Sequence, residues 1–115
     1  PDTALLIVDM LNEFAFPGGR RLLRNAIPIA RRIAEMKRRA KKRGYPVIYA
    51  NDAFGRWNSD RQELIRRCLA DYCAGAGIAR AILPAEEDYF VLKPKHSAFF
   101  STTLETLLAH LGVRR

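Results

Sequence analysis

The feature that most constrains the fold is a run of five apolar residues, Ala4 to Val8, which ends directly in the carboxylate of Asp9. The run does not alternate between apolar and polar residues, as a strand with one solvated face would. A strand that is apolar on both faces is typical of a parallel sheet covered by helices on both sides. We therefore predict a parallel strand over residues 3–9, with Asp9 at its carboxyl end.

Two further runs repeat this pattern. Residues 46–50 and 89–92 are short, rich in β-branched and aromatic residues, and each is followed by polar side chains. Parallel strands joined by right-handed crossovers bring their carboxyl ends to one edge of the sheet, where ligands bind in open α/β folds. The polar side chains predicted to meet at this edge are Asp9, Asn51, Asp52 and Lys93.

The segments between these runs have apolar residues at helical spacing. The first helix is predicted over residues 26–43, with Asn25 as its cap, Pro28 in its first turn and Gly44 after its end. Its apolar side is predicted to contain Ile29, Ile33, Met36 and Ala40.

Two more helices are predicted. One follows Ser59 or Asp60 and ends in the small residues 74–77, and the other follows Thr102 or Thr103 and ends at Gly112. Their apolar positions are Leu64, Ile65, Cys68 and Leu69 in the first, and Leu104, Leu107, Leu108 and Leu111 in the second. With no repeat or linker, residues 1–115 are predicted to form one α/β domain, a Rossmann-like open parallel sheet with helices on both faces.

The formal net charge of +8 is concentrated in one segment. Eleven of the 20 Lys and Arg residues lie between Arg20 and Arg43, with Glu35 as the one acid there. A basic face of this kind could bind phosphates, so one alternative is a non-catalytic protein that uses residues 26–43 to bind nucleic acid or another anionic partner. No aromatic residue is interleaved on that face and no nucleic-acid motif is present, which favours a solvated or subunit-facing helix and a homo-oligomer.

Other compositional features point to an ordinary soluble domain. The longest apolar runs are far shorter than the roughly 20 residues that span a bilayer, and no secretory signal is visible, so we expect a cytoplasmic protein without membrane contact. Cys68 and Cys73 lie five residues apart, which is neither a metal-knuckle nor a disulfide-framework spacing, and we expect reduced thiols.

Taken in order, several segments together resemble the isochorismatase-like cysteine hydrolase family. The most specific are the opening segment that ends in Asp9-Met-Leu-Asn-Glu-Phe14 and the segment that runs from Lys93 to Ser97-Ala-Phe99. The other matching segments are residues 16–19, 47–52 and 82–84, with Asp88. The resemblance covers nearly the whole chain.

This resemblance implies a doubly wound α/β fold and hydrolysis of amides such as nicotinamide, of ureido groups, or of the vinyl ether of isochorismate. Asp9 matches the family's catalytic acid and Lys93 its lysine, with Lys95 as a rival for the lysine role. In the amidohydrolase members the Asp takes the thiol proton, the Lys stabilises the developing charge, and a Cys forms the acyl intermediate.

The family's cysteine follows a fourth strand, and neither Cys68 nor Cys73 occupies such a place. Cys68 is predicted on the apolar face of a helix, where burial raises the pKa of a thiol and lowers its reactivity. We therefore expect an amino-terminal part of a hydrolase, truncated after the third βα unit and inactive as an amidase by itself.

A small-molecule substrate is expected in the crevice. Phe14 and Trp57 could form its aromatic walls beside Asn51 and Asp52, although aromatic residues near strand ends also often pack in the core.

No metal or cofactor is predicted. Nicotinamidase-like members of the family hold a metal with one Asp and two His, whereas His96 and His110 are remote in sequence from Asp52. The segment Gly75-Ala-Gly77 matches a dinucleotide loop only in part and does not follow a strand, so it implies no cofactor.

Overall fold

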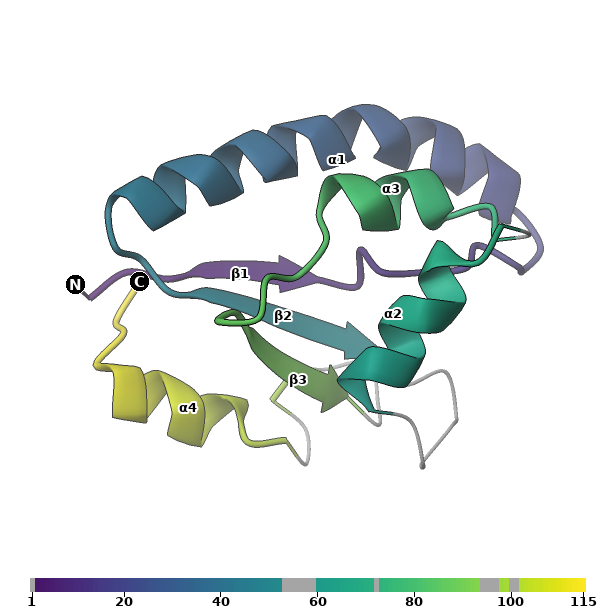
Figure 1. The fold of residues 1–115 in the computed structure, drawn as a ribbon. Helices are drawn as coiled ribbons and strands as arrows, with labels where there is room; N and C mark the ends of the chain where they lie inside the picture. The colour runs from purple at the N-terminus through teal and green to yellow at the C-terminus, as the bar shows by residue number, and fades with distance from the viewer. Residues whose placement is uncertain (1, 53–59, 72, 94–97, 100–101) are drawn as a thin grey trace.

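The computed structural model describes residues 2–52, 60–71, 73–93, 98–99 and 102–115. In this part of the chain three parallel strands form one sheet in the order β1-β2-β3, and the strands are β1 (Leu5–Val8), β2 (Val47–Asp52) and β3 (Tyr89–Lys93). All three predicted strands are confirmed as parallel. β1 is shorter than predicted, whereas β2 and β3 extend to include the polar residues that were expected to follow them (Figure 1).

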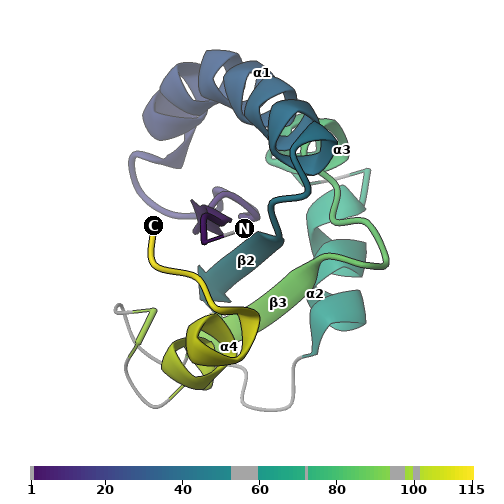
Figure 2. The ribbon, with the colours of Figure 1, turned by 90° about the vertical axis from the view of Figure 1, so that its left-hand side faces the viewer.

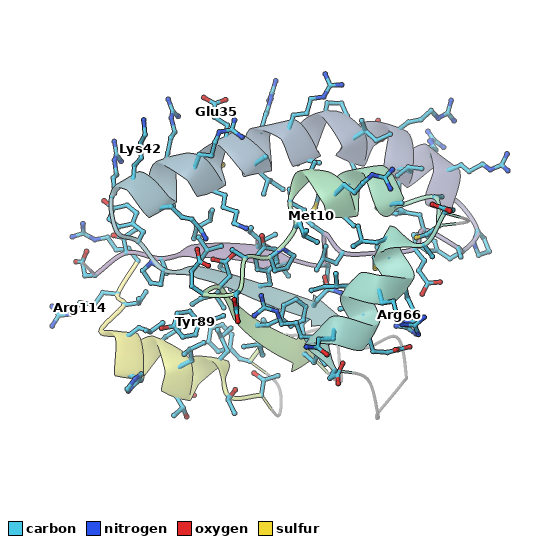
Figure 3. The ribbon with its side chains drawn as sticks, in the orientation of Figure 1. Met10, Glu35, Lys42, Arg66, Tyr89 and Arg114 are labelled. Carbon is cyan, nitrogen blue, oxygen red and sulfur yellow. The ribbon has the colours of Figure 1, made fainter. Side chains whose placement is uncertain are left out.

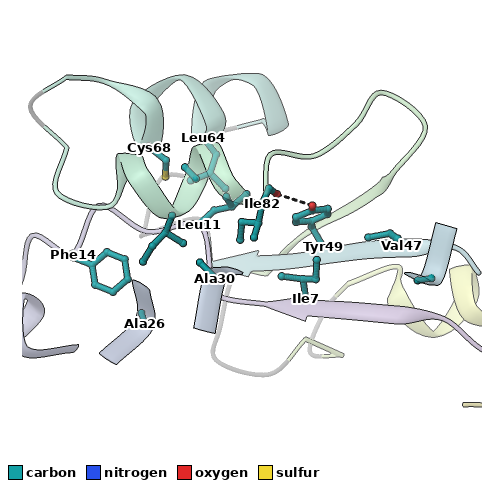
Figure 4. Packing of buried hydrophobic residues seen from close by; sticks show 13 residues of the cluster. Ile7, Leu11, Phe14, Ala26, Ala30, Val47, Tyr49, Leu64, Cys68 and Ile82 are labelled. Atoms are coloured by element: carbon teal, nitrogen blue, oxygen red, sulfur yellow. Dashed lines mark hydrogen bonds between the residues drawn. The ribbon is translucent and has the colours of Figure 1, made fainter. Parts of the chain in front are cut away.

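Helices cover both faces of this sheet. α1 (Gly19–Lys42), α2 (Arg61–Leu69) and α3 (Ala76–Ala81) pack on the face that carries Ile7 and Tyr49, and α4 (Leu104–Leu111) packs on the face that carries Ile48. Figure 2 shows the sheet between α1 and α4. The larger core cluster lies on the face that α1, α2 and α3 cover, and Figure 4 shows its packing. Within it, Tyr49 Oη donates a hydrogen bond of 2.7 Å to the Ile82 carbonyl. The predicted three-layer arrangement is confirmed.

The prediction for the start of α1 was wrong. The helix begins at Gly19, seven residues before the predicted start, so Asn25 and Pro28 lie within it and Asn25 is not its cap. Arg, Leu and Ala have high helix propensity, and the sequence from Arg20 onward continues the helix through the proline. Gly18, with φ of 83°, turns the chain into the helix from the preceding loop.

The buried face of α1 also differs from the prediction. Ile29 and Met36 are half exposed, at 49% and 51%, whereas the small residues Ala26 and Ala30 are buried. Ala40, which was predicted on the apolar side, is buried as well. Small side chains on the inner face allow α1 to pack closely against the sheet and α3, which leaves the larger apolar residues on the flank.

The helix predicted to run from residue 60 to the small residues 74–77 ends earlier, and a further helix follows where none was predicted. α2 ends at Leu69, and the separate α3 begins at Ala76. Gly75, the N-cap of α3, lies so close to the Asn12 carbonyl and the Phe14 ring that a Cβ atom would have no room. Asp60 caps α2 as predicted by accepting a 2.8 Å hydrogen bond from Glu63 N, and Ser59 lies outside the described residues.

Two lysines of the basic helix have structural partners. The Nζ atoms of Lys37 and Lys41 lie 2.7 and 2.8 Å from the buried carboxylate of Asp88, which precedes β3. Burial alone would raise the pKa of Asp88, but hydrogen bonds from Lys37 and Lys41 outweigh it, so the pKa lies below its ordinary value. These ion pairs hold α1 to the sheet.

Other charged side chains of α1, such as Glu35 and Lys42, point away from the body of the protein (Figure 3). No helix in the described ranges is long and apolar enough to cross a membrane.

Candidate active site

Asp9 and Lys93 meet at the carboxyl edge of the sheet. Lys93 Nζ donates a hydrogen bond of 2.8 Å to Asp9 Oδ2, across the end of β2. The two side chains differ sharply in exposure, at 1% for Lys93 and 48% for Asp9. The predicted convergence of these two residues is confirmed, and it leaves the carboxylate accessible while the ammonium group is enclosed.

The backbone holds Asp9 in an unusual conformation. Its φ of 57° lies in the left-handed region, which Asp adopts more readily than most non-glycine residues. Its N–H donates to the Ala50 carbonyl at 3.0 Å, as the last rung between β1 and β2. Its Oδ1 accepts from the N–H of Asp52 at 3.2 Å, so the neighbouring strands β2 and β3 contact different oxygens of the carboxylate. The carboxylate is therefore held in one orientation.

Asn51 lies beneath the loop that follows β1. Its side chain is buried, its Oδ1 accepts from Leu11 N at 3.1 Å, and its Nδ2 donates to the Leu11 carbonyl at 2.8 Å. The side chain of Asn51 thus pairs both the N–H and the carbonyl of buried Leu11, the two backbone groups that a neighbouring strand would otherwise pair. The residue was predicted to bind substrate, and its place in the structure favours a role in positioning the loop that follows Asp9.

Phe14 was also predicted to contact substrate. Its side chain is buried in the larger core cluster, and its ring stacks on that of Phe16 at a centroid distance of 6.3 Å. The backbone at Phe14 has a φ of 56°, and its N–H donates to Asn12 Oδ1 at 2.6 Å. This placement favours an anchoring role in the loop. Trp57, Lys95 and His96 lie outside the described residues.

The cysteines lie away from solvent. Cys68 packs in the core with Leu64 and Ile78, as predicted for the apolar face of its helix, and Cys73 is buried as well. Burial is the main cause that raises the pKa of the Cys68 thiol to about 12, followed by Cys73 and Glu13. A thiol in this state is protonated at neutral pH and is a poor nucleophile.

Metal-binding groups are not apparent in the part of the chain that the structure describes. Within it, no three His, Cys, Asp or Glu side chains lie close enough together to hold an ion.

Two features of the site were missed in the sequence. The first is the clamp between Asn51 and Leu11, which the alternation of β2 could have indicated, because Asn51 shares a strand face with buried Tyr49. The second is Arg67, which is buried on α2 with its Nε 3.8 Å from Glu13 in the loop after β1. No periodic signal distinguishes Arg67 from the exposed arginine that precedes it.

The arrangement supports proton transfer beside a fixed positive charge. An accessible carboxylate can accept a proton from a nucleophile or water, provided that it is oriented and ionised. A buried ammonium group 2.8 Å away stabilises negative charge that develops at the same place.

Comparisons with known proteins agree with this geometry. Residues 3–115 match the family model described as the isochorismatase domain. The chain is 42% identical over 113 residues to an uncharacterised isochorismatase family protein, YaaI, of Bacillus subtilis, covering 98% of this chain and 61% of that protein. It is 31% identical over 124 residues to a probable inactive nicotinamidase of Arabidopsis thaliana, covering 99% of this chain and 63% of the relative.

Among solved structures, the fold is similar to that of N-carbamoylsarcosine amidase from Thermoplasma acidophilum. The TM-score is 0.60 at 28% sequence identity, and the match covers 98% of this chain and 64% of the amidase. The chain thus spans somewhat less than two thirds of the length of each of these proteins. The extent of the family match and the identity to YaaI show that this chain belongs to the isochorismatase family.

Proposed function

We propose that Asp9 and Lys93 form the acid–base part of a site that hydrolyses a small amide or ureido substrate. The observation that carries this proposal is the 2.8 Å contact between the enclosed ammonium of Lys93 and the accessible carboxylate of Asp9. A surface ion pair would expose both partners, and a structural core pair would bury both. The accessible partner, Asp9, can act as a base because a substrate or nucleophile can reach its carboxylate, while the buried Lys93 holds a positive charge beside it.

In the proposed reaction, Asp9 removes the proton of a cysteine thiol. The thiolate attacks the carbonyl carbon of the substrate, and the C–N bond breaks as the proton passes from Asp9 to the leaving nitrogen. Water then attacks the resulting thioester, with Asp9 again as the base, and releases the acid and the thiol. Lys93 stabilises the negative charge on the thiolate and on the tetrahedral intermediates.

The thiol is the part of this proposal that the described residues do not supply at the sheet edge. Cys68 is buried on α2, and burial raises the pKa of its thiol to about 12. We therefore expect the 115-residue chain to show no amidase turnover, and we assign the nucleophile to a longer form of the protein. The named activities of two related proteins, a nicotinamidase labelled probably inactive and an amidase of an N-carbamoyl compound, support amide or ureido carbonyls as the substrate class.

The test compares the chain with a fusion that adds, after Arg115, the part of Bacillus subtilis YaaI that the match does not cover. Release of ammonia is measured with nicotinamide and with N-carbamoyl amino acids. We expect turnover only in the fusion, and we expect Asp9→Asn or Lys93→Ala to abolish it, with the exposed Glu35→Gln as a control that leaves it unchanged. Turnover that survives Asp9→Asn would refute the role of Asp9.

Vinyl-ether hydrolysis is a second candidate reaction, because it needs only a proton donor and water. An isochorismate-type substrate is therefore assayed in parallel at several pH values. Activity of the short chain toward this substrate, lost in Asp9→Asn, would replace the amidase proposal with this one.

The nucleic-acid alternative is less well supported. Lys37 and Lys41 lie on the inner side of α1, where Asp88 engages them, so these two of the basic residues do not contribute to a phosphate-binding face. Affinity for DNA or RNA at two salt concentrations tests it, since several phosphate contacts would give a steep salt dependence.

A further inference from the structure

Arg67 on α2 is a buried cation that the proposed reaction does not use. Its side chain is 6% exposed, and its three side-chain nitrogens have no hydrogen-bond partner in the part of the chain that the structure describes. A buried guanidinium without hydrogen bonds lowers the stability of a fold. An apolar side chain of similar length, such as that of methionine, would fill the same space without unpaired donors. Packing alone therefore does not account for an arginine at this position.

The group that this cation faces is Glu13, in the loop after β1. Arg67 Nε lies 3.8 Å from Glu13 Oε1, which is too long for a hydrogen bond but within the range of an ion pair. Because the guanidinium is enclosed, solvent screens this attraction less than that of a surface pair. α2 also packs on this loop through the core, where Leu64 and Cys68 lie near Leu11 (Figure 4).

The segment that begins at Asp9 thus carries two carboxylates, and each faces a buried cation from another element. Asp9 is 48% exposed and faces Lys93, whereas Glu13 is 29% exposed and faces Arg67. In both pairs the cation is enclosed by its surroundings while the carboxylate keeps access to solvent. A fixed cation restricts the positions that the carboxylate, and the backbone that carries it, can adopt.

The backbone on either side of Glu13 is held by uncharged contacts. Gly75 leaves no room for a Cβ atom beside the Asn12 carbonyl, and Gly19 leaves none beside the Phe14 carbonyl. Among the described residues, the ion pair of Glu13 is therefore the charged link between this loop and α2.

We propose that Arg67 is a positioning residue for the candidate active site. Through the carboxylate of Glu13 it holds the loop after β1 in the conformation that presents Asp9 to Lys93 and to substrate. It acts on the loop and not on the substrate, because its nitrogens are enclosed. This inference rests on the proposed function, but its test uses the 115-residue chain and measures no turnover. Its failure and that of the proposed reaction are therefore distinguishable.

NMR of backbone amides reports on the loop and on the site separately. The N–H groups of Leu11 and Phe14 donate to asparagine side-chain oxygens at 3.1 and 2.6 Å, so their hydrogen exchange measures how firmly the loop is held. The N–H of Asp52 donates to Asp9 Oδ1 at 3.2 Å, so its chemical shift reports the orientation of that carboxylate. The N–H of Tyr45, at the end of α1, is the reference for global unfolding.

Four variants are compared with the wild type. Arg67→Met removes the charge and keeps an apolar side chain of similar length. Glu13→Gln removes the opposite charge from the more exposed partner, and it keeps the test decisive where Arg67→Met does not fold. Arg67→Lys retains the charge and tests rescue. Arg66→Met, at the exposed neighbouring position on α2, is the matched control.

We expect the amides of Leu11 and Phe14 to exchange at least about tenfold faster, relative to that of Tyr45, in Arg67→Met and Glu13→Gln than in the wild type. The Asp52 amide resonance should shift in the same two variants. Both readouts should keep their wild-type values in Arg67→Lys and Arg66→Met. Loop amides that accelerate no more than Tyr45 would reveal a general loss of stability and would overturn the proposal. A loosened loop with an unchanged Asp52 resonance would also overturn it, because the loop would then not act on Asp9.

Discussion

The clamp between Asn51 and the loop after β1 gives the sharpest test of how the site is held together. Replacing Asn51 with Ala removes both hydrogen bonds to Leu11, at 3.1 and 2.8 Å, and leaves a buried N–H and a buried carbonyl without their partner. Each orphaned group costs about 1–3 kcal/mol. We therefore expect the free energy of unfolding of Asn51→Ala to fall by about 2–6 kcal/mol, a large part of the stability of a small domain.

Asn51→Asp separates the two bonds. The carboxylate keeps an acceptor for Leu11 N but cannot donate to the Leu11 carbonyl, so it repels that oxygen. We expect Asn51→Asp also to destabilise the protein. Urea unfolding followed by circular dichroism measures each variant, and the exposed Asn25→Ala on α1 is the control, with an expected change within about 0.5 kcal/mol. A loss below about 0.5 kcal/mol in Asn51→Ala would refute the clamp.

Three further predictions concern packing and charge. The pKa of Asp88 is lowered in the folded state, so its ionised form adds stability that is fully present well above pH 3.8 and is lost as the pH falls below that value. The difference in urea midpoint between wild type and Asp88→Asn should therefore be constant from pH 7 to pH 5 and should shrink as the pH falls below about 3.8. Gly75→Ala should destabilise the protein by at least about 1 kcal/mol, because the new Cβ would collide with the backbone of Asn12. Gly77→Ala, where nothing lies within reach of a Cβ on α3, should stabilise the protein by about 0.5–1 kcal/mol. Equal urea midpoints for the two variants would contradict the close contact at Gly75. The buried Cys68 thiol should react with a disulfide reagent only after urea unfolds the protein, and rapid labelling of Cys68 in the native state, located by mass spectrometry, would contradict its burial.

The sheet and its functional edge were predictable because their signals are local. An uninterrupted apolar run requires cover on both faces, and a polar residue directly after it must lie at the carboxyl edge. Asp9 and Lys93 both follow from this rule, although 84 positions separate them in the sequence. The basic segment was also predictable from the sequence. Its ion pairs with Asp88 were not, since Asp88 lies more than 40 residues from Lys37 and Lys41.

The remaining features depend on how distant elements pack. The start of α1 was predicted from a proline that usually occupies the first turn, but good helix formers before Pro28 extend the helix past it. The exposure of Ile29 and Met36 depends on which surface covers the flank of α1, which helical periodicity does not report. Likewise, the role of Asn51 depends on the loop after β1 reaching back to it, and this follows from the left-handed backbone at Asp9.

The charge balance at the ion pair constrains where the nucleophile of the proposed reaction can lie. Lys93 is enclosed, so its ammonium group needs negative charge nearby at every stage of the reaction. If Asp9 takes a proton from a thiol, the negative charge moves from the carboxylate to the sulfur, and the local net charge is unchanged only if the thiolate also lies near Lys93. A thiol that arrived from the far end of the sheet would leave the buried cation without that compensation. The nucleophile in the proposed mechanism must therefore lie at the carboxyl edge itself, within reach of both Asp9 and Lys93.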